Sequence, residues 1–533
     1  MQAAKLNEVV GIIKSIREGG IRVFYSDDQL KISSKKGVKV PQELLKQIRD
    51  YKTEIIEVLQ QGNEPDLFNP EYNEWFDEKS LNEIVWAEGT RAFPVMHQQE
   101  KEYLRFLFIG DYGFNLTLKI RFEHFDRQVI EKVFETIFDR HESLRTTFID
   151  NDGVFKQVIN HDAFDNSRIK YVNMVKDAGR ESALQNLIAD LSKHPFNFEK
   201  QSLVTINIVH YQEGVYYLLF TLHHVISDET TLNILRSELE TLYEAYLNDE
   251  PNPLTDVAIQ YKEYAKWVND FLNSEKGKKS KNFYREKILK SLIESGIRIG
   301  GEVSYKKQLE ADLQERLKTE NLLLPISKAY GLIVNLIVEP GAAYKTLLNG
   351  NEFAVLKKIA AQYNVSSFTL LVTLMSILFY KIKKDKSLRI YIPYTTRIFE
   401  QFQTIVGWLV GEIILCVDIK ADKTLFEMVE LVNKQITEFA HHRFYPHEKI
   451  MSDLDIPLNI LAPYHINFIK EDHLVKPFVP EHSVLQHGAH FDLRCAVTEY
   501  TDAIEFYIEY KSREFSARNI EAMFKELLVL LKS

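Results

Sequence analysis

An apolar run that ends in two histidines constrains this chain more than any other segment. Residues 214–220 read GVYYLLF and lead, after two residues, into His223 and His224. Apolar continuity over this length is typical of a strand that is buried on both faces. Ser227 and Asp228 then resemble a helix N-terminus, because apolar residues follow at helical spacing. The sequence therefore predicts a mixed α/β fold in which two histidines stand between a buried strand and a helix.

Composition excludes several classes of protein. The 533 residues include 33 Phe and 26 Tyr, which must be buried somewhere, so a disordered chain is excluded. The net charge of −10 argues against a nucleic-acid-binding protein. Cys416 and Cys495 are too few for a disulfide scaffold; we expect them in the core of a protein of the reducing bacterial cytoplasm. The longest apolar stretch, residues 368–380, is too short to span a bilayer and predicts a buried helix in a soluble protein.

The first sixty residues form a mildly basic unit on an acidic body. They carry 11 Lys and Arg against 8 Asp and Glu, a net charge of +3, whereas the remainder carries 55 against 68, a net charge of −13. The pattern predicts a helix over 6–16, two short strands at 21–25 and 29–33, and one or two helices over 41–59. The element order is therefore α-β-β-α-α. The acidic, aperiodic residues 62–90 are expected to be a linker.

The histidine pair allows more than one chemistry. Histidine titrates near neutrality, so His223 or His224 can accept or donate a proton at physiological pH. Taken alone, the pair is also compatible with packing or with metal ligation. No third ligand follows at the spacing of a zinc site, so the sequence predicts no bound metal.

Six segments in a fixed order resemble the condensation domains of nonribosomal peptide synthetases. The family motif HHxxxDG corresponds to residues 223–229, HHVISDE, with Glu229 in the place of glycine. The other matching segments are RHESLRTTF at 140–148, YKEYAKW at 261–267, IYIPYTTR at 390–397, VGWLVG at 406–411 and FDL at 491–493. Together they place the resemblance over residues 93–533.

The resemblance implies a fold and a reaction. The implied fold is a V-shaped pseudo-dimer of two chloramphenicol-acetyltransferase-like lobes, expected at 91–265 and 266–533, with a tunnel between them. The implied reaction is amide formation, in which an amine attacks the thioester of an acyl or peptidyl chain held by a carrier protein. No covalently bound cofactor is expected, because the partner carrier protein supplies the phosphopantetheine arm.

The resemblance also implies roles for individual residues. His224 is the expected catalytic histidine, either as general base or as a group that orients the amine and stabilises the charged intermediate. His223 is expected to fix the loop and the tautomer of its neighbour. Asp228 is expected to hold the loop through a buried ion pair, for which Arg145 is the candidate partner.

Two positions depart from the family pattern. Glu229 either reshapes the tunnel mouth or adds a negative charge that attracts a cationic amine; a solvated surface carboxylate is the favoured interpretation. Gly411 replaces an asparagine of the latch motif, which also contains Trp408. Two basic or histidine-rich segments are expected to be structural: the stretch 276–281, KGKKSK, as a solvated loop, and 441–448, HHRFYPHE, with His441, His442 and His447.

The first sixty residues resemble the N-terminal docking domains of the TubC type found on megasynthase subunits. The resemblance rests on the element order and on the runs GIRV at 20–23 and YKTEII at 51–56. It implies that an acidic C-terminal peptide of an upstream synthetase subunit binds along the hairpin. The candidate contacts are Arg22, Lys31, Lys35, Lys36 and Lys39. The alternative is that these lysines only protect an edge strand from aggregation.

The motifs that the chain lacks shape the functional hypothesis. No adenylation-type phosphate loop, carrier-protein serine or thioesterase elbow is found. We therefore expect the donor on the carrier protein of another subunit and a free small amine as acceptor. This organisation resembles the stand-alone terminal condensation domains of rhabdopeptide-like synthetases. The alternatives are an internal condensation domain with a carrier-bound acceptor, an epimerisation domain and a non-catalytic docking scaffold.

Overall fold

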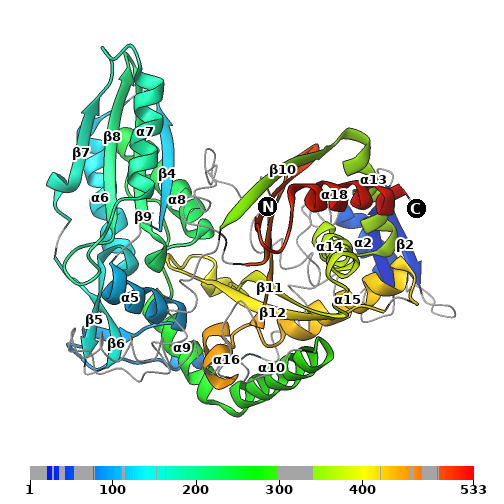
Figure 1. The fold of residues 1–533 in the computed structure, drawn as a ribbon. Coiled ribbons are helices and arrows are strands. Elements are labelled where there is room, and N and C mark those ends of the chain that lie inside the picture. Colours follow the sequence, from blue (N-terminus) through cyan, green and yellow to red (C-terminus); the bar gives the residue numbers. More distant parts are fainter. Residues whose placement is uncertain are drawn as a thin grey trace.

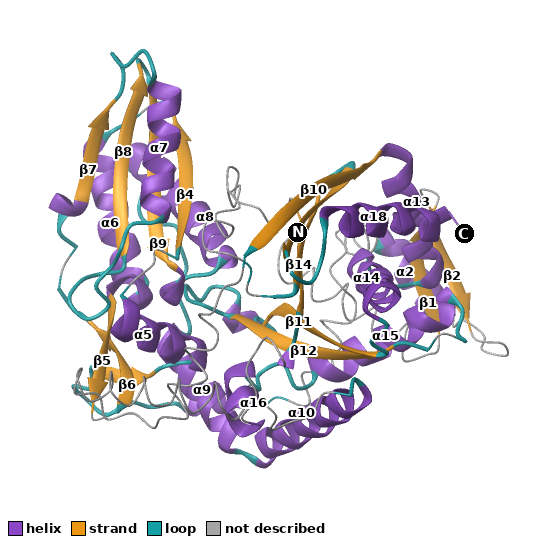
Figure 2. Ribbon diagram, viewed as in Figure 1, coloured by secondary structure: helices purple, strands orange, loops and turns teal. Residues whose placement is uncertain are grey.

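A computed structural model shows two lobes that diverge in a V (Figure 1). The structure describes residues 21–26, 29–34, 42–52, 76, 79–110, 114–123, 125–151, 153–162, 164–296, 340–420, 422–454, 461–470, 489 and 491–532. Each lobe contains a β-sheet with helices packed against it (Figure 2). The predicted mixed α/β class is therefore confirmed.

The N-terminal lobe contains a four-stranded sheet, in the order β4-β9-β8-β7, and a three-stranded sheet, in the order β3-β6-β5. Its strands are β3 (Ala92–Pro94), β4 (Asn115–Phe122), β5 (Thr146–Asn151), β6 (Val154–Ile159), β7 (Ile169–Asn173), β8 (Val204–Gln212) and β9 (Val215–His223). Its longer helices are α5 (His97–Ile109), α6 (Arg127–Arg140), α7 (Arg180–Ser192) and α8 (Glu229–Leu247).

Strand β9 is buried on both faces, as its apolar run predicts. Leu218 and Phe220 pack into the core formed with α6 and α8. Leu219 points to the opposite face, where it joins Leu184 and Leu191 of α7. Successive residues of a strand face opposite sides, so a strand between two helical layers needs apolar residues at every position.

The C-terminal lobe is built on a six-stranded sheet in the order β10-β15-β14-β13-β11-β12. Its strands are β10 (Gly341–Asn349), β11 (Ser387–Thr395), β12 (Val410–Asp418), β13 (Tyr464–Lys470), β14 (Leu493–Glu499) and β15 (Ala503–Lys511). Its helices include α9 (Tyr261–Asn273), α10 (Glu275–Glu294), α13 (Gly350–Tyr363), α14 (Ser367–Lys383), α15 (Leu425–Ala440), α16 (His447–Leu454) and α18 (Ala517–Lys532). Cys416 and Cys495 are buried in its core, and this burial raises the pKa of each thiol to about 12.

Helix α14 is the buried helix that the stretch 368–380 predicts. Among the described residues no single helix is long and apolar enough to cross a membrane. Helices α13 and α14 reach that length and apolarity only together, and a bend of 103° separates them.

Two expectations about helices α9 and α10 need correction. The expected lobe boundary at residue 265 falls inside α9, a continuous helix whose apolar face joins the core of the C-terminal lobe. The stretch 276–281 is not a loop but the first turns of α10, which Ser274 caps by accepting the Gly277 N–H.

The described part of the expected linker contacts helix α9. Phe76 is buried, and its ring lies 6.2 Å from the ring of Trp267. The indole of Trp267 donates a hydrogen bond to Ser80 Oγ at 3.0 Å. Trp86 Nε1 donates to Glu263 Oε1 at 2.7 Å. These contacts fix the described part of the linker to the body.

The N-terminal unit contains the predicted hairpin. Strands β1 (Ile21–Ser26) and β2 (Gln29–Ser34) pair antiparallel, with Arg22 opposite Ser33 and Lys31 opposite Phe24. Helix α2 (Gln42–Asp50) follows. The expected first helix, the helix beyond residue 52 and the candidates Lys35, Lys36 and Lys39 lie outside the described residues.

Candidate active site

The two histidines lie on a short loop between β9 and α8. The strand ends at His223, a 3₁₀ turn named η4 covers His224–Ile226, and Asp228 caps α8. The cap is made by Asp228 Oδ1, which accepts the Thr231 N–H at 2.7 Å. A short polar side chain at this position satisfies an otherwise unpaired helix N–H group.

His223 is buried and holds the loop. Its Nδ1 accepts the Val225 N–H at 3.0 Å, which assigns the proton of a neutral ring to Nε2. Its ring packs edge-on against Phe196 and Phe198. These contacts support the structural role that the sequence predicts.

His224 lies between two aromatic rings from opposite lobes. Phe114, at the start of β4, stacks on the imidazole at a centroid distance of 4.6 Å, and its carbonyl accepts the His224 N–H at 2.8 Å. Trp408, from the segment between β11 and β12, packs against the imidazole at a centroid distance of 4.5 Å, with the two ring planes tilted by 48°. Burial lowers the pKa of His224, and the nearby Asp228 carboxylate opposes this shift. The ring is therefore neutral at physiological pH and able to accept a proton.

The ion-pair partner of Asp228 is Arg397, not Arg145. Arg397 follows β11 in the C-terminal lobe, and its Nη2 lies 3.0 and 3.2 Å from the two carboxylate oxygens. Both side chains are buried. Arg397 Nη1 donates to the carbonyls of Phe402 and Ile405 at 2.8 Å each, so a second edge of the guanidinium is held within its own lobe.

The prediction for Arg145 was wrong because its guanidinium bonds to backbone. It donates to the carbonyls of Phe138 at 2.7 Å, Asn160 at 2.8 Å and Asp139 at 3.2 Å. Arg145 therefore joins the end of helix α6 to the strands that follow it. Both arginines lie in segments that resemble the family, Arg145 in RHESLRTTF and Arg397 at the end of IYIPYTTR.

A segment of the C-terminal lobe, residues 406–409, is bound to the N-terminal lobe. Val406 is buried in the N-terminal core, and its carbonyl accepts from Ser143 Oγ at 2.6 Å. Gly407 exchanges two hydrogen bonds with Thr231 Oγ1 of α8, at 2.8 and 3.1 Å. The Leu409 N–H donates to Asp228 Oδ2 at 2.9 Å. The histidine loop is thus fixed by both lobes.

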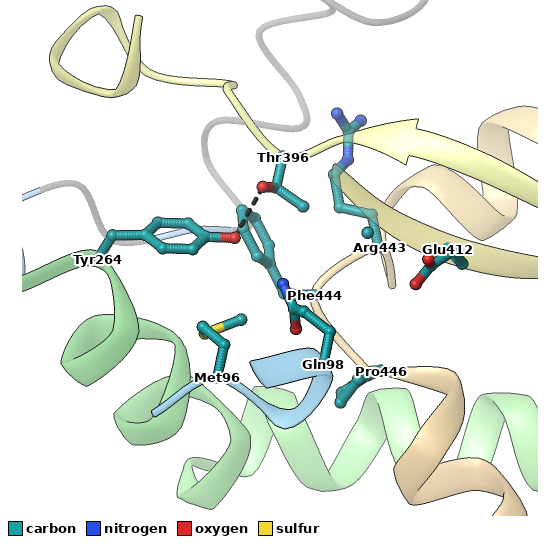
Figure 3. Close-up of a pocket in the computed structure, with 9 residues that line it drawn as sticks. Met96, Gln98, Tyr264, Thr396, Glu412, Arg443, Phe444 and Pro446 are labelled. Atoms are coloured by element: carbon teal, nitrogen blue, oxygen red, sulfur yellow. Dashed lines mark hydrogen bonds between the residues drawn. The ribbon is translucent and has the colours of Figure 1, made fainter. Parts of the chain in front are cut away.

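The latch residues Trp408 and Gly411 have different roles. The Trp408 carbonyl accepts from Gln98 Nε2 at 3.2 Å and from Tyr261 Oη at 2.9 Å, which places the indole on His224. Gly411 lies in β12 and lines a cavity of about 20 Å³ between the lobes (Figure 3). A space of this size holds about one water molecule, so this cavity is too small for a substrate.

Glu229 is not a solvated surface carboxylate. It is the first residue of α8 and is partly buried, with Oε1 inaccessible to solvent and without a hydrogen-bond partner among the described residues. Burial, and then the adjacent Asp228 charge, raise the pKa of Glu229 to about 7. The favoured sequence interpretation is therefore corrected.

The second histidine cluster lies in the C-terminal lobe, where His442 and His447 are buried and His441 is partly buried. His441 and His442 close α15, and burial lowers the pKa of His442 to about 4. His447 lies between two carboxylates: its Nδ1 is 3.3 Å from Glu412 and its Nε2 is 3.2 Å from Glu448. The side chains of Glu412, His447 and Glu448 each place one potential metal-ligand atom within 4.8 Å of the others. Lys101 Nζ, 3.3 Å from Glu448, also supplies positive charge there.

Fold and site together define a two-lobed α/β protein in which a histidine loop is held at the lobe junction. The condensation domain family matches residues 92–334 and 341–533. The TubC N-terminal docking domain family matches residues 9–61. The chain therefore belongs to the condensation domain family, whose members form amide bonds, and it carries a docking domain before that body. Both resemblances are confirmed.

The curated relatives are peptide synthetases. The chain is 23% identical over 416 residues to bacitracin synthase 1 of Bacillus licheniformis, which covers 76% of this chain and 7% of that protein. It is 23% identical over 466 residues to surfactin synthase subunit 1 of Bacillus subtilis (strain 168), covering 86% of this chain and 12% of that protein. The chain thus corresponds to a small part of each relative.

Solved structures share the fold. The X-domain from teicoplanin biosynthesis matches with a TM-score of 0.62 and 17% identity, over 84% of this chain and 95% of that one. A structure on condensation domain-mediated chain release from the enacyloxin polyketide synthase matches with a TM-score of 0.60 and 15% identity, over 98% and 96%. The epimerization domain from the third module of a tyrocidine synthetase matches with 0.60 and 13%, over 84% and 99%.

Proposed function

We propose that the chain forms an amide between an acyl or peptidyl thioester on a partner carrier protein and a free small amine, and so releases the product. The observation that carries this proposal is the loop from His223 to Asp228, which both lobes hold in place. A loop fixed this firmly keeps His224 pre-organised at the junction.

The chemistry needs little more than alignment and one proton acceptor. A thioester is already activated, so the amine nitrogen attacks its carbonyl carbon once the two are held together. We propose that neutral His224 accepts the proton that the nitrogen loses. Phe114, which stacks on the imidazole, and Trp408, which packs against it, are proposed to stabilise the imidazolium that forms. His223 and Asp228 position the loop without contacting the reacting atoms.

The donor is proposed to arrive on another subunit. A docking domain before the condensation body supports this, because such a domain would bring an upstream subunit and its carrier protein to the active site. We propose that an acidic C-terminal peptide of that subunit adds to the β1–β2 hairpin, with Arg22 and Lys31 among its contacts. The structure on enacyloxin chain release offers a precedent for release by a domain of this fold.

The reaction is tested with the full chain, a carrier protein loaded with an acyl thioester, and n-butylamine. Amide formed by the wild type and lost in His224→Ala supports the proposal. Amide formed only when the amine is an aminoacyl group on a second carrier protein would identify an internal condensation domain. Racemisation of the carrier-bound residue without amide would identify epimerisation. Equal rates for wild type and His224→Ala would identify the chain as a non-catalytic docking scaffold.

Docking is tested separately by deletion of residues 1–61. The shortened chain is expected to need a much higher concentration of the donor subunit for the same rate, while its maximal rate stays unchanged. High salt is expected to weaken docking of the intact chain, because charges steer the peptide. Equal concentration dependence with and without the first 61 residues would exclude docking through this unit.

A further inference from the structure

Glu229 is an ionisable side chain of the histidine loop that the reaction described above does not use. It follows the capping residue Asp228 and stands one short turn, η4, from His224. Its Oε1 is inaccessible to solvent and accepts no hydrogen bond from the described residues. A carboxylate oxygen in this condition costs free energy unless a proton or a cation reaches it.

The described part of the chain supplies no cation to Glu229. Arg397 reaches the loop from the C-terminal lobe, and its charge is taken by Asp228 together with two backbone carbonyls. No Lys, Arg or His nitrogen of the described residues lies within 4.0 Å of the Glu229 carboxylate. The loop therefore carries two adjacent carboxylates, of which one is paired and one is not.

We propose that Glu229 binds the ammonium group of the acceptor amine and takes its proton before the amine attacks the thioester. This inference rests on the proposed function, because it assigns the acceptor class to the same site. The ligand is a small primary ammonium ion. Glu229 is only partly buried, so a rotation of its side chain brings Oε1 to solvent, where the substrate ammonium supplies the partner that this oxygen lacks in the chain.

A free amine needs such a group, whereas a carrier-bound amino acid does not. An alkylamine resembles a Lys side chain, with a pKa of about 10.4, so at neutral pH fewer than about one molecule in a thousand is neutral. An α-amino group has a pKa of about 7.7–8.0 and is already partly neutral. A base beside the attack site is therefore specific to acceptors of the first kind. A carboxyl group whose pKa lies near neutrality suits this exchange better than an ordinary glutamate.

The protons and electron pairs balance. The ammonium gives one proton to the Glu229 carboxylate and becomes a neutral amine. The nitrogen lone pair forms the C–N bond, the C–S bond breaks, and the carrier thiolate leaves. The second nitrogen proton passes to His224 and then to the thiolate. Glu229 returns its proton to solvent, so the net products are the amide, the carrier thiol and one proton.

The charged groups around the loop are consistent with Glu229 accepting the first proton and His224 the second. Asp228 lies beside Glu229 and opposes its ionisation. Asp228 and Glu102 favour the charged form of His224, and His223 opposes it. Arg397 faces Asp228 from the C-terminal lobe. His224 and Glu229, the two proposed proton acceptors, therefore lie in different electrostatic environments on the same loop.

The test compares two amines in the full chain with the carrier-bound thioester. n-Butylamine is protonated at pH 7, whereas methoxyamine is neutral there. Glu229→Gln, which keeps the shape and removes the charge, is expected to raise KM for n-butylamine at least about tenfold. The rate with methoxyamine is expected to change less than about twofold, because that amine is already neutral and has no ammonium proton to lose before it attacks. Glu229→Gly, which restores the family residue, is expected to behave in the same way.

Two control variants and the wild-type activity distinguish the possible results. Glu244→Gln, an exposed position on the same helix, is expected to leave both amines unaffected. His224→Ala is expected to abolish the reaction with both amines. A wild type that forms no amide with either amine would reject the proposed function itself. A wild type that forms both amides, with Glu229→Gln unchanged for n-butylamine, would overturn this inference and leave the proposed function intact.

Discussion

Arg397 of the C-terminal lobe donates hydrogen bonds to both carboxylate oxygens of Asp228 in the N-terminal lobe, at 3.0 and 3.2 Å. The same carboxylate caps α8 and accepts the Leu409 N–H. The position of the histidine loop therefore depends on the contact between the lobes. A separation of the lobes would break this ion pair and the Leu409–Asp228 hydrogen bond together.

Removing one partner of this pair is expected to destabilise the protein strongly. Asp228→Ala or Arg397→Ala should cost about 3–5 kcal/mol, because the remaining charge stays buried. Asp270→Ala, which breaks the exposed pair with Lys266, should cost less than about 1 kcal/mol. Urea unfolding of the three variants measures the difference. Equal costs for Asp228→Ala and Asp270→Ala would show that the lobe contact does not depend on this pair.

The elements around the site were predictable from sequence, but the contacts between lobes were not. Strand β9, the β1–β2 hairpin and α14 follow from local periodicity. The Asp228–Arg397 pair joins residues 169 positions apart, and no local pattern encodes such a pairing. Arg145 and Arg397 both lie in segments that resemble the family. Only the structure shows that the Arg145 guanidinium is bound by backbone carbonyls and is therefore not the partner of Asp228.

Glycine gave a misleading signal in helix α10. The stretch 276–281, KGKKSK, resembles a loop because glycine and charged residues are frequent in loops. In the structure a Cβ atom on Gly277 would lie 2.4 Å from the Phe271 carbonyl, so this glycine permits close packing of α10 on the end of α9. The requirement comes from a neighbouring helix and cannot be read from local composition. Phe114 likewise gave no signal, because its contact with His224 depends on the pairing of β4 with β9.

The two histidines should respond differently to substitution. His224→Ala is expected to lower kcat at least about 100-fold, as loss of a proton acceptor does, with little change in stability. His223→Ala removes the cap on the Val225 N–H and two edge-on aromatic contacts, so it should cost about 2–4 kcal/mol. Thermal unfolding and turnover are measured on both. A stable but inactive His223→Ala would instead place that residue in the chemistry.

The pH profile should report the burial of His224. With methoxyamine, which does not use Glu229, the rate should fall only in acid below the usual histidine range, because the lowered pKa of His224 keeps that base neutral and active at neutral pH. Trp408→Leu removes the aromatic cover and lets water in, so the pKa should rise and the acid limb should move to higher pH. Trp408→Phe should keep the profile. Identical profiles for Leu and Phe would show that the ring face does not act on His224.

Glu229 should make stability depend on pH. Its pKa in the folded chain, about 7, lies above its usual value of 4.5, so the folded state favours the protonated form. The stabilising contribution is complete below pH 4.5 and is lost as the pH rises through 7. At pH 8 Glu229→Gln should therefore be more stable than wild type by about 1–2 kcal/mol, allowing for partial exposure. Urea unfolding at pH 5 and pH 8 measures this, and an equal difference at both would contradict it.

Gly407 should tolerate no side chain, because a Cβ atom there would lie 2.1 Å from Tyr261 Cδ2. The Tyr261 hydroxyl also positions Trp408, so the clash cannot be relieved without moving the indole from His224. Gly407→Ala is expected to cost about 1–3 kcal/mol and to lower kcat. Gly179→Ala, whose Cβ atom would make only an ordinary 3.5 Å contact, is the matched control.

In a double-mutant cycle, Tyr261→Leu should make room for the new methyl group, so Gly407→Ala should cost less stability in that background. Activity should stay low in the double variant, because the hydroxyl that holds the Trp408 carbonyl is gone. Recovery of both stability and activity would mean that Tyr261 only fills space and does not position Trp408.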